Sequence, residues 1–284
     1  MDDKLFITLT PGHTFIDKLT GKTKTRLFFI LIFILTFTWD IRIMIPIFLL
    51  AVVALISIKP DRKKNAAIIL FVLFMNLFNL FLTWIIRPDY GLEMVGGSTV
   101  LFKFTDFFIV TSETLWYFLV RLTKFMASFL LSLTFIQSIT PSELAAGLHS
   151  MKIHYKICMI VSLAFRYIPD ITRDFNNIRI SMQTRGLELD ARKSSIYKRL
   201  KQYVLILAPL VITSFDRVGN IANGMDLRGF GKNKDKTYYC EHEDTAGDKL
   251  LRPFVWISFL TLITVIVMKI LYKPAYEVWA PWIH

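Results

Sequence analysis

The 284-residue chain lacks the local signatures of several enzyme classes. It contains no G-x-x-x-x-G-K-[ST] phosphate loop, so we do not expect it to bind a nucleotide through that motif. It contains no HExxH zinc motif either, and His149 and His154 are five residues apart, a poor spacing for two ligands on one helical face. We therefore predict no catalytic residue, no metal site and no cofactor bound by this chain.

Cysteine is also scarce. Cys158 and Cys240 do not form a CxxC pair, and we expect both to be free thiols without a functional role. Residues 1–25 are polar and mixed, and no small-residue cleavage site follows the first apolar run. The sequence therefore predicts no secretory signal peptide at this end.

Apolar residues, by contrast, are abundant. They make up 54% of the chain, including 25 Phe, whereas soluble domains usually contain about 45–50%. Because 20% of residues are nevertheless charged, charge has to be segregated along the chain. This composition predicts an all-α integral membrane protein with about five transmembrane helices. The net charge of +12 favours anionic lipid or an acidic protein as partner. A nucleic-acid partner is not expected, because aromatic and basic residues are not interleaved.

Five apolar runs are candidate spans, at 27–38, 43–58, 66–86, 112–137 and 253–271. The first two are shorter than the roughly 20 residues that a perpendicular helix needs. They predict either two short or tilted helices with a turn at Trp39–Asp40, or one long helix broken near Pro46. Residues 59–65 read as a basic turn and 87–106 as a loop. Asn76 and Asn79 in the third span predict hydrogen bonds between helices.

The basic segments fix the expected orientation, because cytoplasmic loops are enriched in Lys and Arg. Residues 139–250 alone hold 17 of the 34 Lys and Arg. We therefore predict a membrane domain at 1–137, a cytoplasmic domain at 138–250, and a last span with a short outer tail at 251–284. The N-terminus would lie inside and the C-terminus outside. Arg121 and Lys124 in the fourth span would lie near a membrane boundary and extend towards it.

Two apolar stripes at helical spacing lie in the central segment, and they predict two long amphipathic helices. We expect these faces to pack as a helix pair or to fill a groove on a partner. Pro169 and Pro209 interrupt the stripes, which predicts a kink or a break in each helix. The stripes consist of Val161, Ala164, Ile168, Ile171, Phe175, Ile178 and Met182, and of Val204, Ala208, Val211, Phe215, Val218, Ala222 and Met225.

Each stripe ends in the same pattern, small-Met-polar-x-Arg-Gly-apolar, and the two copies are offset by 43 residues. The Gly suits a left-handed position that stops a helix, and the Arg places a guanidinium at the helix end. One interpretation is ordinary capping, in which Arg complements the helix dipole. The other is a contact site for a partner, which the presence of two matched copies favours. The copies contain Thr184, Arg185 and Gly186, and Leu227, Arg228 and Gly229.

At these residues the sequence resembles the transmembrane T component of energy-coupling factor transporters, the CbiQ/EcfT-like family. That family carries two Ala-Arg-Gly-like motifs at the ends of two cytoplasmic coupling helices, and here Thr184 and Leu227 stand in place of the Ala. The resemblance extends to Thr140-Pro141-Ser142-Glu143-Leu144, which looks like the short helix that opens the coupling domain. It also extends to Ser162 through Pro169, and to Phe15-Ile16-Asp17-Lys18-Leu19 near the N-terminus.

The resemblance implies a subunit of an ATP-driven bacterial importer of a vitamin or a transition-metal ion. The two Arg-Gly motifs would dock into two ABC-type ATPase subunits, which would bind ATP and Mg. A separate small membrane protein, the S component, would bind the substrate. The chain would reside in the bacterial cell membrane. The alternatives are a secondary transporter or a membrane-anchored scaffold with a basic cytoplasmic domain, but the repeat lies in the central segment rather than among the spans, which disfavours a transporter built on inverted repeats.

Overall fold

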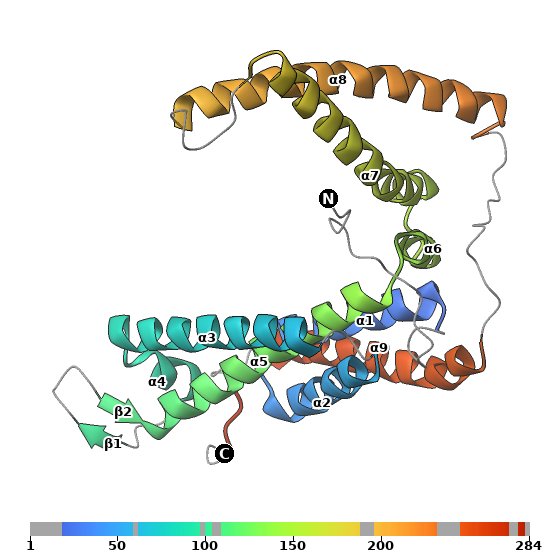
Figure 1. Cartoon of the computed structure of the whole chain (residues 1–284). Coiled ribbons are helices and arrows are strands. Elements are labelled where there is room, and N and C mark those ends of the chain that lie inside the picture. Colours follow the sequence, from blue (N-terminus) through green and yellow to red (C-terminus); the bar gives the residue numbers. More distant parts are fainter. Residues whose placement is uncertain are drawn as a thin grey trace. The chain divides into compact units, whose positions relative to one another are not determined.

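A computed structural model describes residues 19–58, 62–96, 100–103, 109–187, 196–231, 245–272 and 278–281. These residues form two compact units, here called the membrane unit (19–151 with 245–281) and the two-helix unit (152–231). Figure 1 shows that both are built almost entirely of helices, with one pair of short strands, which confirms the predicted all-α class. Some predictions fall outside the described residues: the resemblance at 15–18, the turn residues 59–61, and Cys240.

The core of the membrane unit lies among α1 (Gly21–Phe37), α2 (Ile41–Ser57) and α5 (Ser112–Ser138). Leu35, Met44, Ala51 and Val120 are fully buried there, because the three helices turn their apolar faces towards one another. α1 ends at Phe37 and α2 begins at Ile41, so the prediction of two short helices is confirmed. The alternative of one helix broken near Pro46 is wrong, since Pro46 lies inside α2.

Polar side chains connect α3 (Arg62–Ile86) to α5 at two places. Asn65 and Gln137 exchange two amide hydrogen bonds, at 3.1 and 3.0 Å. Farther along the pair, the Arg121 guanidinium donates to Asn79 Oδ1 at 2.9 Å and to Thr83 Oγ1 at 3.3 Å. The predicted hydrogen bond between helices is therefore confirmed for Asn79. It is wrong for Asn76, whose amide donates to Val72 of its own helix.

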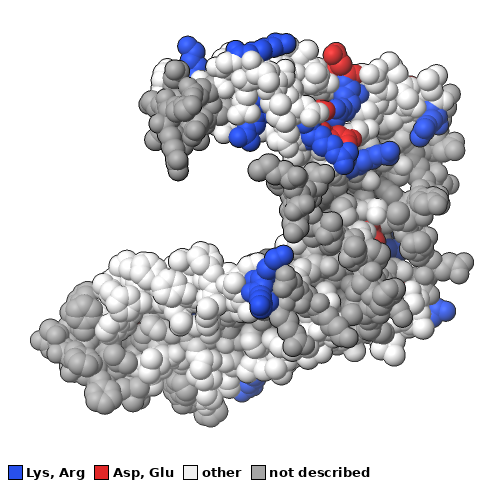
Figure 2. Space-filling model, in the orientation of Figure 1, with Lys and Arg blue, Asp and Glu red and all other residues white. Residues whose placement is uncertain are grey.

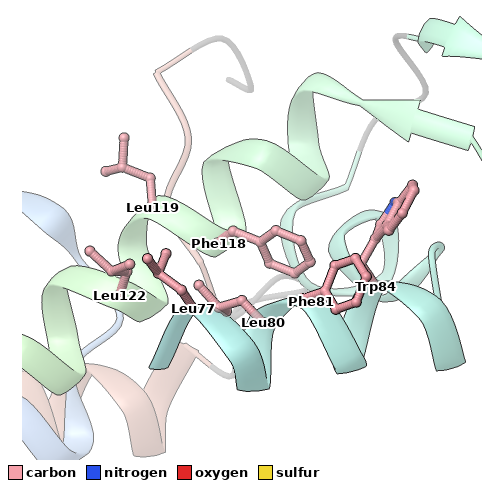
Figure 3. A pocket seen from close by; sticks show the side chains of 7 residues that line it. All are labelled: Leu77, Leu80, Phe81, Trp84, Phe118, Leu119 and Leu122. Atoms are coloured by element: carbon pink, nitrogen blue, oxygen red, sulfur yellow. The ribbon is translucent and has the colours of Figure 1, made fainter. Parts of the chain in front are cut away.

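The remaining seam between α3 and α5 is loosely filled. An apolar pocket of about 320 Å³ lies there, and Figure 3 shows side chains of both helices around it. Most of α3 faces outward: Leu70 is 67% exposed and Phe71 60%. Such exposure of large apolar side chains suits a lipid-facing helix. The pocket is lined by Leu77, Leu80, Phe81, Trp84, Phe118, Leu119 and Leu122.

Two sequence predictions around α3 are wrong in detail. The segment 87–106 is not simply a loop, because it contains the short helix α4 (Tyr90–Val95) and the strand β1 (Val100–Lys103). β1 pairs antiparallel with β2 (Ile109–Thr111). The basic segment 59–65 is not wholly a turn, since α3 already begins at Arg62. α4 and β1 are too short to show a long periodic pattern, and the polar first turn of α3 precedes its apolar run.

The membrane unit is completed by α6 (Pro141–Ser150) and α9 (Ala246–Tyr272), which both pack on α1. α6 begins with a capping box, in which the Thr140 and Glu143 side chains each accept from the other residue's backbone N–H at 3.3 and 3.0 Å. Pro141 at the first helical position suits this start. The short helix that the resemblance at Thr140 to Leu144 implied is thus present.

The two-helix unit consists of α7 (Tyr155–Thr184) and α8 (Ile196–Leu227). Both predicted long helices are confirmed. Pro169 and Pro209 lie inside continuous helices, so neither helix is split there. On the face drawn in Figure 2, charged side chains gather over this unit and are sparse over the apolar surface of the membrane unit.

Four described helices are long and apolar enough to cross a membrane, judged by length and composition. Three of them, in α3, α5 and α9, contain the predicted spans 66–86, 112–137 and 253–271. The fourth is Leu200–Leu227 in α8, which the sequence analysis placed in the cytoplasmic domain. α1 and α2 have 17 residues each, or about 26 Å at 1.5 Å per residue, and are shorter than a bilayer core of about 30 Å.

Two matched helix ends as candidate contact sites

The two repeated motifs form the same backbone structure at the ends of α7 and α8. After α7, Leu187 N–H donates to Met182 O at 3.0 Å, and Gly186 N–H donates to Gln183 O at 3.0 Å. After α8, Phe230 N–H donates to Met225 O at 3.0 Å, and Gly229 N–H donates to Asp226 O at 2.9 Å. This pair of bonds defines a Schellman motif, which satisfies carbonyl groups that a helix end would otherwise leave unpaired.

The Schellman geometry explains three of the repeated positions. Gly186 has φ 91° and Gly229 φ 71°, which is the left-handed region that favours glycine. The Met and the final apolar residue occupy the two positions that usually contact each other in this motif. The Arg is the exception, because neither backbone bond of the motif depends on its side chain.

Arg185 and Arg228 are both exposed, and within the described part of the chain neither side chain forms a hydrogen bond or an ion pair. Leu227, next to Arg228, is 90% exposed. At a helix C-terminus a cation is stabilised by the dipole, typically by about 0.3–1 kcal/mol. Both guanidinium groups are therefore exposed at positions where a partner can contact them.

The two motifs do not form one joint site. In Figure 1 the C-terminal end of α7 lies away from that of α8, so the two guanidinium groups belong to different places on the unit. The second motif is anchored to the start of α7, because the rings of Tyr155 and Phe230 lie 5.8 Å apart. The arrangement therefore offers two separate and similar contact points.

An ion pair between Asp174 and Arg217 joins α7 to α8. It was not found from the sequence, although these residues are offset by the same 43 positions as the two motifs. The signal that could have predicted this ion pair was the presence of opposite charges at equivalent positions of two matched helices. On α8, the described apolar residues Ile206 and Leu210 are buried, at 0% and 8% exposure.

The predicted apolar stripes are largely left uncovered. On α8, Val211, Phe215 and Val218 are 49%, 71% and 59% exposed, whereas Met225 is half-buried. On α7, Ile171 is 39% exposed, and Phe175, Ile178 and Met182 are half-buried. The two-helix unit by itself therefore does not bury the stripe of α8, which suits a surface that contacts lipid or protein. Among the described residues, no group of three His, Cys, Asp or Glu could hold a metal ion.

Comparison with known proteins places these features in a family context. Residues 12–239 match the family CbiQ, described as cobalt transport protein. Three relatives named energy-coupling factor transporter transmembrane protein EcfT are similar over long stretches. The Staphylococcus aureus protein is 26% identical over 92% of this chain and 98% of its own length. The Lactococcus lactis protein is 23% identical over 95% of this chain and 100% of its own length. The Limosilactobacillus fermentum protein is 29% identical over 56% of this chain and 62% of its own length.

Proposed function

Because the chain belongs to the CbiQ family of cobalt transport proteins, we propose that it is the transmembrane coupling component of an energy-coupling factor transporter. In this role it transmits movement from ATPase subunits to a substrate-binding membrane subunit. ATP and Mg are bound by the ATPases, since the chain has no phosphate loop. The cargo is a vitamin or a transition-metal ion.

The pair of matched helix ends is the observation that carries this proposal. A partner present in two copies offers two equivalent grooves, and this chain offers two equivalent Schellman ends, each with an exposed Arg. A guanidinium suits such a contact because its planar fork can donate to a carboxylate or to backbone carbonyls with fixed geometry. Arg185 and Arg228 would each engage one of two ABC-type ATPase subunits.

The substrate-binding subunit, or S component, would contact apolar surface that the chain leaves uncovered. The stripe of α8 at Val211, Phe215 and Val218 is a suitable surface, because it lies on the helix that bears the second Arg. Movement of an ATPase would then reach the S component through one continuous helix. Contact with the bilayer is the alternative for the same residues.

We place the N-terminus and residues 138–250 in the cytoplasm and the C-terminus outside. The 17 Lys and Arg of the central segment support this orientation. α8 is apolar enough to span, but it also carries Lys201, Asp216, Arg217 and Asp226. We therefore assign α8 to the cytoplasmic side, where these charges remain hydrated.

Purification of the tagged chain from its host, followed by identification of the proteins that copurify, tests the proposal. We expect two ATPase subunits and one small membrane protein. A chain that copurifies with neither, or that transports a substrate by itself without ATP, would contradict the coupling role.

A further inference from the structure

α6, the helix that precedes the two-helix unit in the chain, packs directly on α1. Gly147 of α6 lies so close to α1 that an added Cβ would be 2.1 Å from Thr25 Oγ1 and 2.7 Å from the Gly21 backbone oxygen. A Cβ on Gly21 would in turn lie 2.4 Å from the Glu143 carbonyl oxygen. The two helices therefore touch backbone to backbone at this point, and no layer of flexible side chains separates them.

Charged side chains of α1 hold both ends of α6. The Lys24 ammonium, on a residue only 6% exposed, donates to the Ser138 carbonyl at 2.8 Å and lies 3.4 Å from the Glu143 carboxylate. Two residues farther along α1, the Arg26 guanidinium donates to the carbonyl of Ser150, the last residue of α6, at 2.8 Å. Polar contacts at both ends and close contact between them leave α6 little freedom to move against α1.

The start of α9 is fixed to the same part of α1. The Asp248 carboxylate accepts from the Thr20 backbone N–H at 3.1 Å, from the Thr20 hydroxyl at 3.0 Å, and from the Thr245 N–H at 2.9 Å. Asp248 is 4% exposed. Thr20 occupies the N-cap position of α1 and Asp248 lies in the first turn of α9, so one carboxylate lies at the N-terminal ends of two helices, where the dipoles stabilise it.

The chain enters the two-helix unit after α6 and returns from it before α9, so both connections run to residues 20–26 of α1. We propose that residues 20–26, α6 and the first turn of α9 form one rigid joint through which movement of the two-helix unit reaches the membrane helices. The two-helix unit begins just beyond Ser150, at Lys152, whose φ of 64° is uncommon for a residue other than glycine. This inference rests on the proposed coupling function and names the positioning residues Lys24, Gly147 and Asp248.

The contact of Thr20 with Asp248, here called the clasp between α1 and α9, provides the sharpest test. In a chain with Cys158→Ala and Cys240→Ser, Thr20→Cys and Asp248→Cys are introduced together, since the Thr20 and Asp248 side-chain oxygens lie 3.0 Å apart. The assembled transporter is assayed for substrate uptake per ATP hydrolysed, first reduced and then bridged by oxidation or by a short bifunctional thiol reagent. We expect the ratio to fall several-fold when the clasp is absent and to recover when a covalent bridge replaces it.

A second variant tests the α6 side. Gly147→Ala should also lower uptake per ATP while the ATPases remain bound. Gly219→Ala, where an added Cβ meets nothing within 4 Å, is the matched control for membrane level. The joint is refuted if the reduced double-cysteine protein couples as well as the cysteine-free chain, or if a bridge that has formed does not restore coupling. It is also refuted if Gly147→Ala leaves the ratio unchanged. If the unmutated chain binds no ATPase, the proposed function fails instead.

Discussion

Replacement of Arg185 and Arg228 by Ala separates a capping role from a contact role. In the free chain both side chains are exposed, and the Schellman bonds around them run between backbone groups. Loss of a guanidinium should therefore cost only its interaction with the helix dipole, about 0.3–1 kcal/mol. We expect each variant to insert and to unfold thermally almost as the unmutated chain does.

The effect should be much larger in the assembled transporter. Truncation of one partner of a buried charge pair typically costs about 2–5 kcal/mol. Since each 1.4 kcal/mol is a factor of ten, that is roughly a 30-fold to several-thousand-fold weaker contact. One variant should weaken coupling at one of two contacts, and the double variant should nearly abolish it. Arg→Lys should rescue only partly, because an ammonium cannot make a two-pronged contact.

The assay compares membrane level, ATPase copurification and ATP-driven uptake for the two single variants and the double variant. Arg179→Ala is the matched control, since it removes the same charge from an exposed position on α7 before the motif. If Arg179→Ala is as damaging as Arg185→Ala, the effect is one of net charge. A double variant that inserts, retains its ATPases and transports at the unmutated rate would refute the coupling role.

Three further predictions follow from the orientation, the apolar stripes and the glycines. A cysteine that replaces Gly96 should react with an impermeant thiol reagent on intact cells, whereas one that replaces Lys234 should react only after the membrane is opened. Labelling of Lys234→Cys on intact cells would contradict the cytoplasmic assignment of this segment. Phe215→Asp should hardly change the thermal stability of the isolated chain, because Phe215 is 71% exposed, but it should abolish assembly with the partner subunits. Phe175→Asp should lower both the thermal stability and the assembly. Normal assembly of both variants would mean that neither face is buried in the transporter. Gly186→Ala, at φ 91°, should destabilise the chain by about 1–2 kcal/mol, whereas Gly219→Ala should stabilise it slightly, and equal thermal midpoints would contradict the strain argument.

Periodicity and turn chemistry predicted much of this fold. The spans in α3, α5 and α9 were visible because each is a long apolar run, and the ends of α7 and α8 because a Gly marks a left-handed stop. The contacts between Gly21 and Gly147 and between Thr20 and Asp248 were not predicted. They join residues more than a hundred positions apart, and no local pattern encodes which helix faces which.

The stripe of α8 shows most clearly what a sequence pattern cannot predict. The helical spacing of these residues predicted an apolar face, but it could not show which apolar residues of the helix are buried. Ile206 and Leu210 are covered, whereas Phe215, only five residues beyond Leu210, is not. Five residues along a helix correspond to a rotation of about 140°, so Leu210 and Phe215 lie on different faces of α8. Ile206 and Leu210 are not members of the predicted stripe, and the face that is buried is therefore not the face that the stripe predicted.

The attachment of α3 constrains that helix in one direction only. Its two polar contacts with α5, at Asn65 and at Asn79, are about 14 residues apart, or about 21 Å along the helix. Sliding by a single residue would turn both amides away from Gln137 and Arg121 at once, so axial displacement is opposed at two points. The seam beside the Asn79 contact, where the apolar pocket lies, is loosely filled and offers little resistance to tilting. A bilayer of different thickness would accordingly change the inclination of α3 without changing its register.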